Sequence, residues 1–202
     1  MYWGVLVMLE LVDLLSNTFR WRMKTLETEL AAARKKVEEL ESKVETDPLL
    51  GIFNRRGFER ELKRALAYVN RYQSSNALVF IDLNNFKAIN DRHGHLAGDN
   101  VLKTVSVAIN RNLRASDIVA RFGGDEFAIL LWNLTPASAR AKALALENMI
   151  ASLKMSHASA SLSVGASAGM TMLLDADHPS DVMARADADM YSRKQAISRT
   201  AA

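Results

Sequence analysis

The stretch "ARFGGDEFAILL", Ala120–Leu131, constrains the fold of this chain more than any other. Phe127–Leu131 is an unbroken run of apolar, mostly β-prone residues, which predicts a buried strand. Ile118–Phe122 predicts a second strand, and the two glycines between them predict the turn of a hairpin. Two adjacent acids, Asp125 and Glu126, stand at the mouth of the buried strand, where an uncompensated charge is costly.

The rest of the chain alternates helical and strand patterns. Of its 202 residues, 49% are hydrophobic, enough to bury a sizeable core. The expected fold class is α/β, an α+β sandwich around one sheet, in a domain spanning residues 47–202. Helices are predicted over Arg56–Tyr72, Leu96–Leu113, Pro136–Leu153 and Pro179–Ala196, and further strands over Ala77–Ile81 and within Ser161–Leu173.

An N-terminal helix is predicted over residues 1–46, with a heptad pattern from Met23 to Val44. Positions a are Met23, Leu30, Val37 and Val44, and positions d are Leu26, Ala33 and Leu40. Residues that would face each other across a parallel pair carry opposite charges: Arg22 and Glu27, Glu29 and Arg34, Lys36 and Glu41. The pattern predicts a parallel homodimeric coiled coil. The alternative is a solvated single helix whose charges are mixed by chance. "TDP", Thr46–Pro48, should end the helix, because proline disfavours helical geometry in the residue before it.

Composition excludes several classes of function. The net charge is only +3 and no block of lysine and arginine stands out, so no nucleic-acid partner is expected. The chain has no cysteine, which excludes disulfides and thiolate metal sites. The apolar opening "MYWGVLVMLELVDLL" is interrupted by Glu10 and Asp13 and is too short to span a bilayer. We therefore expect no transmembrane segment in this chain and a cytoplasmic location.

A third acid, Asp82, ends the strand predicted by "ALVFI". If that strand neighbours the hairpin, Asp82 meets Asp125 and Glu126. Two carboxylates about 4 Å apart repel by about 4 kcal/mol at an effective dielectric constant of 20. A divalent cation such as Mg²⁺, bound by a few carboxylates and by substrate phosphates, removes that cost. The alternative is that Asp82 caps the next helix and that the other two acids are ordinary turn residues.

The residues after Asp82 predict a phosphate site. Asn84 and Asn85 are expected to cap a helix that carries Lys87. The free N–H groups and positive dipole end of such a helix suit a phosphate group.

"GGDEF" at Gly123–Phe127 resembles the signature of the GGDEF-domain family, the bacterial diguanylate cyclases. Other stretches resemble the family in the same order: "DPLLGIFNRRGF" (Asp47–Phe58), "DLNNFKAIND" (Asp82–Asp91), "GHLAGD" (Gly94–Asp99), "RASD" (Arg114–Asp117) and "ADADMY" (Ala186–Tyr191). Together they cover Asp47 to about Lys194, most of the chain.

The resemblance implies a palm-like, nucleotidyl-cyclase-type domain that condenses two GTP into cyclic di-GMP with release of pyrophosphate. It implies Mg²⁺, with Mn²⁺ as an alternative ion, bound by the carboxylates of Asp82 and Asp125 and the carbonyl of Leu83. Glu126 would assist deprotonation of the attacking 3′-hydroxyl or share in metal binding. The implied contacts to the nucleotide are Asn90 and Asp99 at the guanine edge, Asn85, Phe86, Lys87 and Lys194 at the phosphates, and the backbone of Gly123 and Gly124.

Regulation and dimerisation also follow from the resemblance. "RASD" is similar to the family's product-binding inhibitory RxxD site, which implies that Arg114 and Asp117 bind cyclic di-GMP. Each domain would hold one GTP, so that turnover needs a homodimer, which the coiled coil would supply. The alternative for "RASD" is a surface ion pair worth at most about 1 kcal/mol.

The chain departs from the family pattern at three places, and the last of them keeps rival functions open. Leu50 stands where threonine is usual, Asn84 stands where aspartate is frequent, and Ser198 in the C-terminal tail stands where a phosphate-binding arginine is expected, although Arg199 follows. The first rival is a degenerate domain that binds GTP or cyclic di-GMP without turnover. The second is a structural dimerisation protein with a vestigial domain.

Overall fold

The structure is a computed structural model that describes residues 19–37, 44–157 and 160–200; for residues 157, 160 and 196–200 it describes the backbone alone. The chain divides into two compact units, Met1–Val44 and Glu45–Ala202, which are described separately. Within the described ranges, no helix is both long and apolar enough to cross a membrane.

In the first unit, residues 19–37 form one helix. The heptad residues Met23, Leu26, Leu30 and Val37 are all exposed on it, each with at least 43% of its surface accessible. Leu40 and Glu41 lie outside the described residues. The predicted continuation of the helix to Val44 is wrong, because Val44 is not helical. The chain that follows is extended: Thr46 forms a β-bridge with Phe53.

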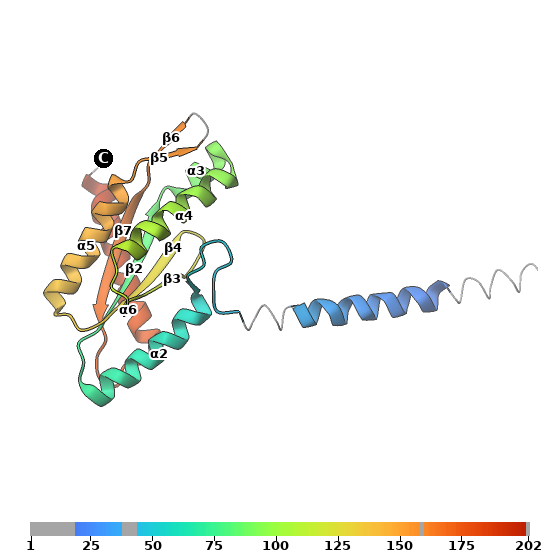
Figure 1. Ribbon diagram of the computed structural model, residues 1–202, viewed down its shortest axis with the longest axis horizontal. Coiled ribbons are helices and arrows are strands. Elements are labelled where there is room, and N and C mark those ends of the chain that lie inside the picture. Colours follow the sequence, from blue (N-terminus) through green and yellow to red (C-terminus); the bar gives the residue numbers. More distant parts are fainter. Residues whose placement is uncertain (1–18, 38–43, 158–159, 201–202) are drawn as a thin grey trace, which may run out of the picture. The chain divides into compact units, whose positions relative to one another are not determined.

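The second unit is built on a five-stranded sheet in the order β1-β3-β4-β2-β7 (Figure 1). The strands are β1 (Phe53–Asn54), β2 (Ala77–Asn84), β3 (Ile118–Arg121), β4 (Glu126–Leu131) and β7 (Gly165–Met172). β1 pairs with β3 in parallel, and every other pair is antiparallel. β2 and β4 are central and almost entirely buried, which explains why both are continuous apolar runs.

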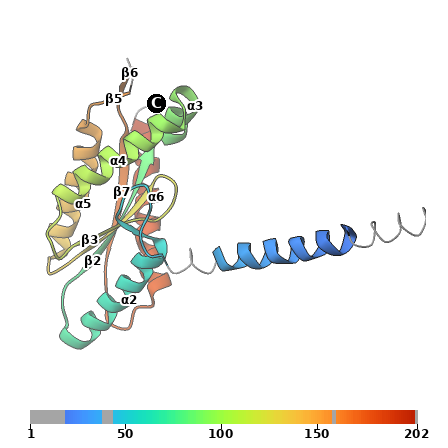
Figure 2. The same cartoon turned by 45° about the vertical axis from the view of Figure 1, so that its right-hand side comes forward.

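Helices cover both faces of this sheet (Figures 1 and 2). α2 (Arg55–Tyr72) and α6 (Pro179–Thr200) pack on the face that Leu78 and Phe80 enter from β2. α3 (Phe86–His93), α4 (His95–Arg111) and α5 (Pro136–Ser152) pack on the face that Val79 and Ile81 enter. Alternate residues of β2 therefore belong to two different cores, and the predicted α/β sandwich is confirmed.

Several local predictions need correction. β2 continues past Ile81 to Asn84, so Asp82 lies within the strand and does not cap the next helix. Asn84 is a strand residue that accepts a hydrogen bond from Ser167 Oγ at 3.0 Å. Asn85 occupies the N-cap position of α3 in a left-handed conformation, but its side chain makes no capping hydrogen bond.

The short strands were predicted poorly. No strand was expected at β1 or at β5 (Met155–His157), and the strand expected within Ser161–Leu173 is divided between β6 (Ala160–Leu162), which pairs with β5 in a separate two-stranded sheet, and β7. Strands of two or three residues are too short for an alternating pattern to be recognised.

Candidate functional site

Two of the predicted acids face each other across neighbouring strands. β2 and β4 are antiparallel with Asp82 directly opposite Glu126. Asp82 follows Leu78 and Phe80 in the alternation of β2, so its side chain lies on the α2/α6 face of the sheet. The expectation that the strands are neighbours and that their acids meet is confirmed.

Asp125 completes this acidic group from the turn that precedes β4. The backbone N–H of Leu83 donates to the carbonyl of Asp125 at 3.2 Å, which holds the turn against the end of β2. Burial raises the pKa of the Asp125 carboxyl, and the charge of Asp82 raises it further. Burial likewise raises the pKa of Glu126, with further contributions from Asp82, Asp125 and Asp187. The three acids therefore form a site with an excess of negative charge.

A lysine from the last helix partly neutralises this negative charge. Lys194 Nζ on α6 lies 2.5 Å from Asp82 Oδ1. Its charge opposes the rise in the pKa of both Asp125 and Glu126. Ser198, the residue that departs from the family pattern, lies on the same helix, but its side chain and that of Arg199 are outside the described part.

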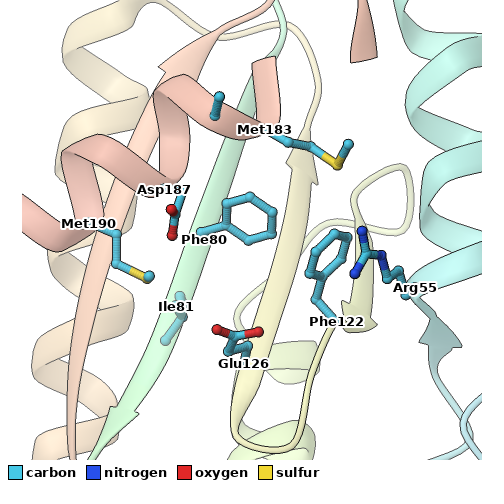
Figure 3. Close-up of a pocket in the computed structure, with 9 residues that line it drawn as sticks. Arg55, Phe80, Ile81, Phe122, Glu126, Met183, Asp187 and Met190 are labelled. Carbon is cyan, nitrogen blue, oxygen red and sulfur yellow. The ribbon is translucent and has the colours of Figure 1, made fainter. Parts of the chain in front are cut away.

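Glu126 also lines a pocket of about 230 Å³ between α2 and α6 (Figure 3). Phe80, Phe122, Met183 and Met190 make most of its wall apolar. Asp187 lines this pocket as well, and this carboxylate was not predicted as a site residue, although it belongs to the "ADADMY" stretch.

Arg55 at the start of α2 is the second missed residue of this pocket. Its guanidinium lies 4.7 Å from the ring centre of Phe122, the residue before the two glycines. Nothing in the local sequence pairs Arg55 with Phe122, because the parallel β1–β3 pairing that brings them together was itself not predicted.

The two glycines of the turn have different surroundings. A side chain at Gly123 would begin 2.3 Å from Glu126 Oε2, whereas one at Gly124 would meet nothing within 4 Å. Neither glycine is in the left-handed region, so backbone strain does not require them. Open space at Gly124 leaves room for a ligand.

Arg121 holds this turn in place. Its Nη2 donates to the carbonyl of Gly124 at 2.8 Å, and its Nε donates to the carbonyl of Gly123 at 3.2 Å. Its Nη1 lies 3.2 Å from Asp47 Oδ2, and the other oxygen of Asp47 accepts the N–H groups of Leu49 and Leu50. The turn that carries the acids is thereby fixed to the start of the second unit.

The start of α3 lies at the end of β2. Asn85 and Lys87 are exposed there, as a phosphate site requires. The side chain of Phe86 is only 8% exposed and packs in the core, so Phe86 can offer a ligand only its backbone. The side chain of Asn85 accepts no hydrogen bond from the first N–H groups of α3, so it leaves them to other acceptors.

The predicted guanine residues lie where α3 packs on α4. A side chain at Gly98 would begin 1.9 Å from Asn90 Oδ1, so the amide of Asn90 lies directly over Gly98. Asp99 is the next residue along α4, and both Asn90 and Asp99 are half-buried. Because Gly98 has no side chain, the amide of Asn90 can lie close to Asp99, the other residue predicted to bind guanine.

The acidic group suits a hard divalent cation. Asp82 and Asp125 supply carboxylate oxygens, and the chain supplies backbone carbonyls beside them, which are the donors that Mg²⁺ prefers. Among the described residues, no group of three or more histidine, cysteine or acidic side chains is arranged to hold a metal ion by itself. Mg²⁺ usually takes only one or two carboxylates and completes its shell with water and phosphate, so the residues present fit it.

Arg114 and Asp117 lie apart from these acids, at the other end of the β3–β4 hairpin. Asp117 Oδ2 accepts the backbone N–H of Arg114 at 2.9 Å, and Asp117 Oδ1 accepts that of Trp132 at 3.2 Å. The two residues line a pocket of about 300 Å³ together with Trp132 and Lys142. The described contacts do not pair the side chains of Arg114 and Asp117 as a surface salt bridge.

Comparison with known proteins gives a family match over most of the chain. The family described as "Diguanylate cyclase, GGDEF domain" matches residues 44–200. The chain is 38% identical over 167 residues to the probable diguanylate cyclase DgcE of Escherichia coli K12, covering 82% of this chain and 15% of DgcE. It is 37% identical over 187 residues to the diguanylate cyclase TpbB of Pseudomonas aeruginosa, covering 90% of this chain and 42% of TpbB. The chain thus spans less than half the length of these relatives.

A solved structure resembles most of the chain. It is the coiled coil and GGDEF domain of DgcB from Caulobacter crescentus in complex with c-di-GMP. The TM-score is 0.72 at 26% identity, and the match covers 88% of this chain and 95% of that one.

Proposed function

Since the chain belongs to the GGDEF-domain family of diguanylate cyclases, we propose that it condenses two GTP molecules into cyclic di-GMP and releases two pyrophosphates. The observation that carries the proposal is the acidic group of Asp82, Asp125 and Glu126, with Lys194 beside it. Such a group suits a reaction between two polyphosphates, where negative charge must be neutralised.

In this proposal the acids and the start of α3 hold the reacting part of GTP. Asp82, Asp125 and the Leu83 carbonyl hold Mg²⁺, which when bound neutralises phosphate charge and polarises the reacting phosphorus centre. Lys87, Lys194 and the N–H groups of Asn85 and Phe86 bind phosphate oxygens. Glu126, whose pKa is raised, accepts the proton of the attacking 3′-hydroxyl or shares in metal binding.

We further propose that Asn90 and Asp99 recognise guanine. An amide and a carboxylate can together pair with the acceptor and donor groups on the edge of that base. Their support is the close packing of Asn90 on Gly98, which places the two groups at one junction of α3 and α4.

Turnover in this proposal requires two copies of the chain. Each second unit holds one GTP, and the exposed apolar residues of helix 19–37 form the seam of a parallel coiled-coil homodimer. Because the coiled coil joins the two copies, the local concentration of one second unit around the other rises to the order of millimolar.

Product inhibition is proposed at Arg114 and Asp117. The support is a pocket that Arg114, Asp117 and Lys142 line together, so that two cationic side chains are available at one site to a ligand with two phosphates.

The test of the proposed function is incubation of the purified chain with GTP and Mg²⁺, followed by chromatographic separation of the nucleotides over time. Formation of cyclic di-GMP that slows as product accumulates supports catalysis and inhibition together. Bound GTP without product, in a dimeric sample that also fails to turn over at high concentration, would favour the rival function of a non-catalytic binding domain.

A further inference from the structure

We propose that Arg193 on α6 and Glu147 on α5 form a positioning pair that holds Lys194 at the acidic group. This inference rests on the function proposed above, in which Lys194 binds a phosphate group of GTP. It gives the neighbouring arginine a role in substrate binding that requires no contact with the nucleotide.

The two helices of this pair lie on opposite faces of the sheet at its open edge. β7 is the last strand in the order, so one side of it has no neighbouring strand. α5 packs on one face and α6 on the other, and both contact β7. A side-chain link between α5 and α6 therefore passes around the edge of β7.

The backbone of α6 lies directly against β7 at Gly169. A side chain at Gly169 would begin 2.1 Å from the backbone nitrogen of Met190 and 2.5 Å from the carbonyl oxygen of Ala186. This contact sets how closely the helix approaches the strand. Because a glycine has no side chain to interlock, the contact does little to fix the position of the helix along the strand.

Polar side chains along one side of α6 supply that position. Arg185, Asp189 and Arg193 are spaced four residues apart, which places them on one side of the helix. Arg185 Nη2 donates to the carbonyl of Met172 at 3.2 Å. Asp189 Oδ2 accepts the N–H of Met170 at 2.7 Å. Both bonds go to backbone groups of β7, so they define the register between helix and strand.

Arg193 binds α5 instead of the strand. Its Nη2 lies 2.7 Å from Oε2 of Glu147, a residue that is only 8% exposed. One turn earlier on α6, Asp189 Oδ2 lies 2.5 Å from Arg140 Nη1 of α5. The two ion pairs join α5 to α6 around the edge of β7, and the pair at Arg193 stands immediately before Lys194.

A role in positioning explains this pair better than a role in stability. Arg193 Nε is buried and has no hydrogen-bond acceptor among the described residues. A buried ion pair with an unmatched donor regains little of the free energy lost when its charges leave water, and an apolar pair of similar size is often at least as stable. An ion pair, however, favours one register over its neighbours, which is the best-attested use of such pairs.

Lys194 depends on that register. It follows Arg193 directly, about 100° further around the helix, and its Nζ lies 2.5 Å from Asp82 Oδ1. Both residues belong to the same helical turn, so a rotation or slide of α6 that separates Arg193 from Glu147 also moves Lys194. The ammonium would then leave the acids and the proposed phosphate position.

A paired substitution separates positioning from stability. Glu147→Met combined with Arg193→Met removes both charges and keeps the side-chain bulk, so the free energy of unfolding should not fall. The Kd for α,β-methylene-GTP with Mg²⁺, an analogue that cannot release pyrophosphate, should nevertheless rise about three- to fivefold. Urea unfolding and calorimetry on the full chain measure the two quantities. A Kd equal to that of the parent in the folded double variant would overturn the inference.

A double-mutant cycle with Lys194→Met gives a second test. Arg193→Gln should raise the Kd about threefold or more in the parent, but less than about twofold in Lys194→Met, where no ammonium is left to position. Arg193→Lys, which keeps a cation beside Glu147, should stay within about twofold of the parent. Equal factors in both backgrounds would show a general structural effect and refute the positioning role.

The same titrations keep the two levels of the proposal apart. A raised Kd in Lys194→Met with a parent-like Kd in the Glu147→Met, Arg193→Met variant would refute the positioning pair and leave the proposed function standing. An unchanged Kd in Lys194→Met would remove Lys194 from the phosphate site and the positioning role with it. A parent chain that does not bind the analogue would refute the proposed function itself, and the positioning role with it.

Discussion

Lys194 on α6 lies 2.5 Å from Asp82 on β2, although 112 residues separate them in the chain. A residue proposed to bind phosphate thus neutralises a residue proposed to bind metal. Lys194→Met should raise the KM for GTP about tenfold or more, because one cation is lost and the acids repel each other more strongly. Initial rates against GTP concentration measure this, with exposed Lys103→Met as the control. An unchanged KM would remove Lys194 from the site.

Asp125→Asn should lower turnover by about a thousandfold or more, since it removes one of the two proposed metal carboxylates without changing the size of the side chain. Binding of cyclic di-GMP should persist, because Arg114 lies at the other end of the β3–β4 hairpin. The matched control is Asp91→Asn on the exposed end of α3. Equal turnover in the parent and the Asp125 variant would contradict the proposed catalytic centre.

Gly124→Ala should separate stability from activity. A methyl group there meets no protein atom within 4 Å, so the free energy of unfolding should change by about 0.5 kcal/mol or less. If the substrate approaches the backbone at this point, cyclic di-GMP synthesis should fall by roughly tenfold. Urea unfolding and initial rates on one sample measure both quantities. A variant as active as the parent would show that the open space at Gly124 is not used.

Asp177 and Arg185 predict an acid-dependent stability. The hydrogen bonds from Arg185, at 2.6 and 3.0 Å, lower the pKa of Asp177, and the N–H of Leu174 lowers it further against the effect of burial. A lowered pKa stabilises the fold fully above the ordinary pKa of aspartate, about 3.9, and this stabilisation is lost as the pH falls through the lowered value.

Asp177→Asn should therefore cost about 1 kcal/mol near neutral pH, and the difference from the parent should shrink below about pH 4. Urea unfolding at several pH values measures it. A difference that grows on acidification would refute this assignment.

Leu30→Lys should separate the proposed coiled-coil dimer, because it places a charge at a seam position. Specific activity should then fall on dilution. Ala32→Lys, at an outward heptad position of the same helix, is the control. Light scattering gives the oligomeric state; a dimeric Leu30→Lys protein would show that another surface joins the copies.

The sequence predicted well what depends on local pattern. The long helices and the β3–β4 hairpin follow from periodicity and from the two glycines, and the meeting of Asp82 with the hairpin acids followed once their strands were assumed to be neighbours. The end of the N-terminal helix was misjudged at Val44, because the pairing of Thr46 with Phe53 depends on a strand of two residues.

What the sequence missed depends on contacts between distant segments. Asp187 lies near Glu126 only because α6 packs on β2 and β7, and the backbone of Trp132 lies near that of Arg114 only because Asp117 accepts an N–H from both. Helix propensity and spacing carry no information about such pairs. The loss of a capping role for Asn84 has the same origin, because pairing with β7 extends β2 through that residue.

The end of β2 separates the two ends of the proposed substrate. Asn90 and Asp99 belong to helices on one face of the sheet, while Lys194 belongs to a helix on the other, with Asp82 at the crossing point. In the proposed binding mode, the contacts to the base and the contact to Lys194 therefore lie on opposite faces of the sheet. A ligand that makes both sets of contacts needs a base at one end and a phosphate chain at the other, which would set a nucleoside triphosphate apart from a free base or a free pyrophosphate.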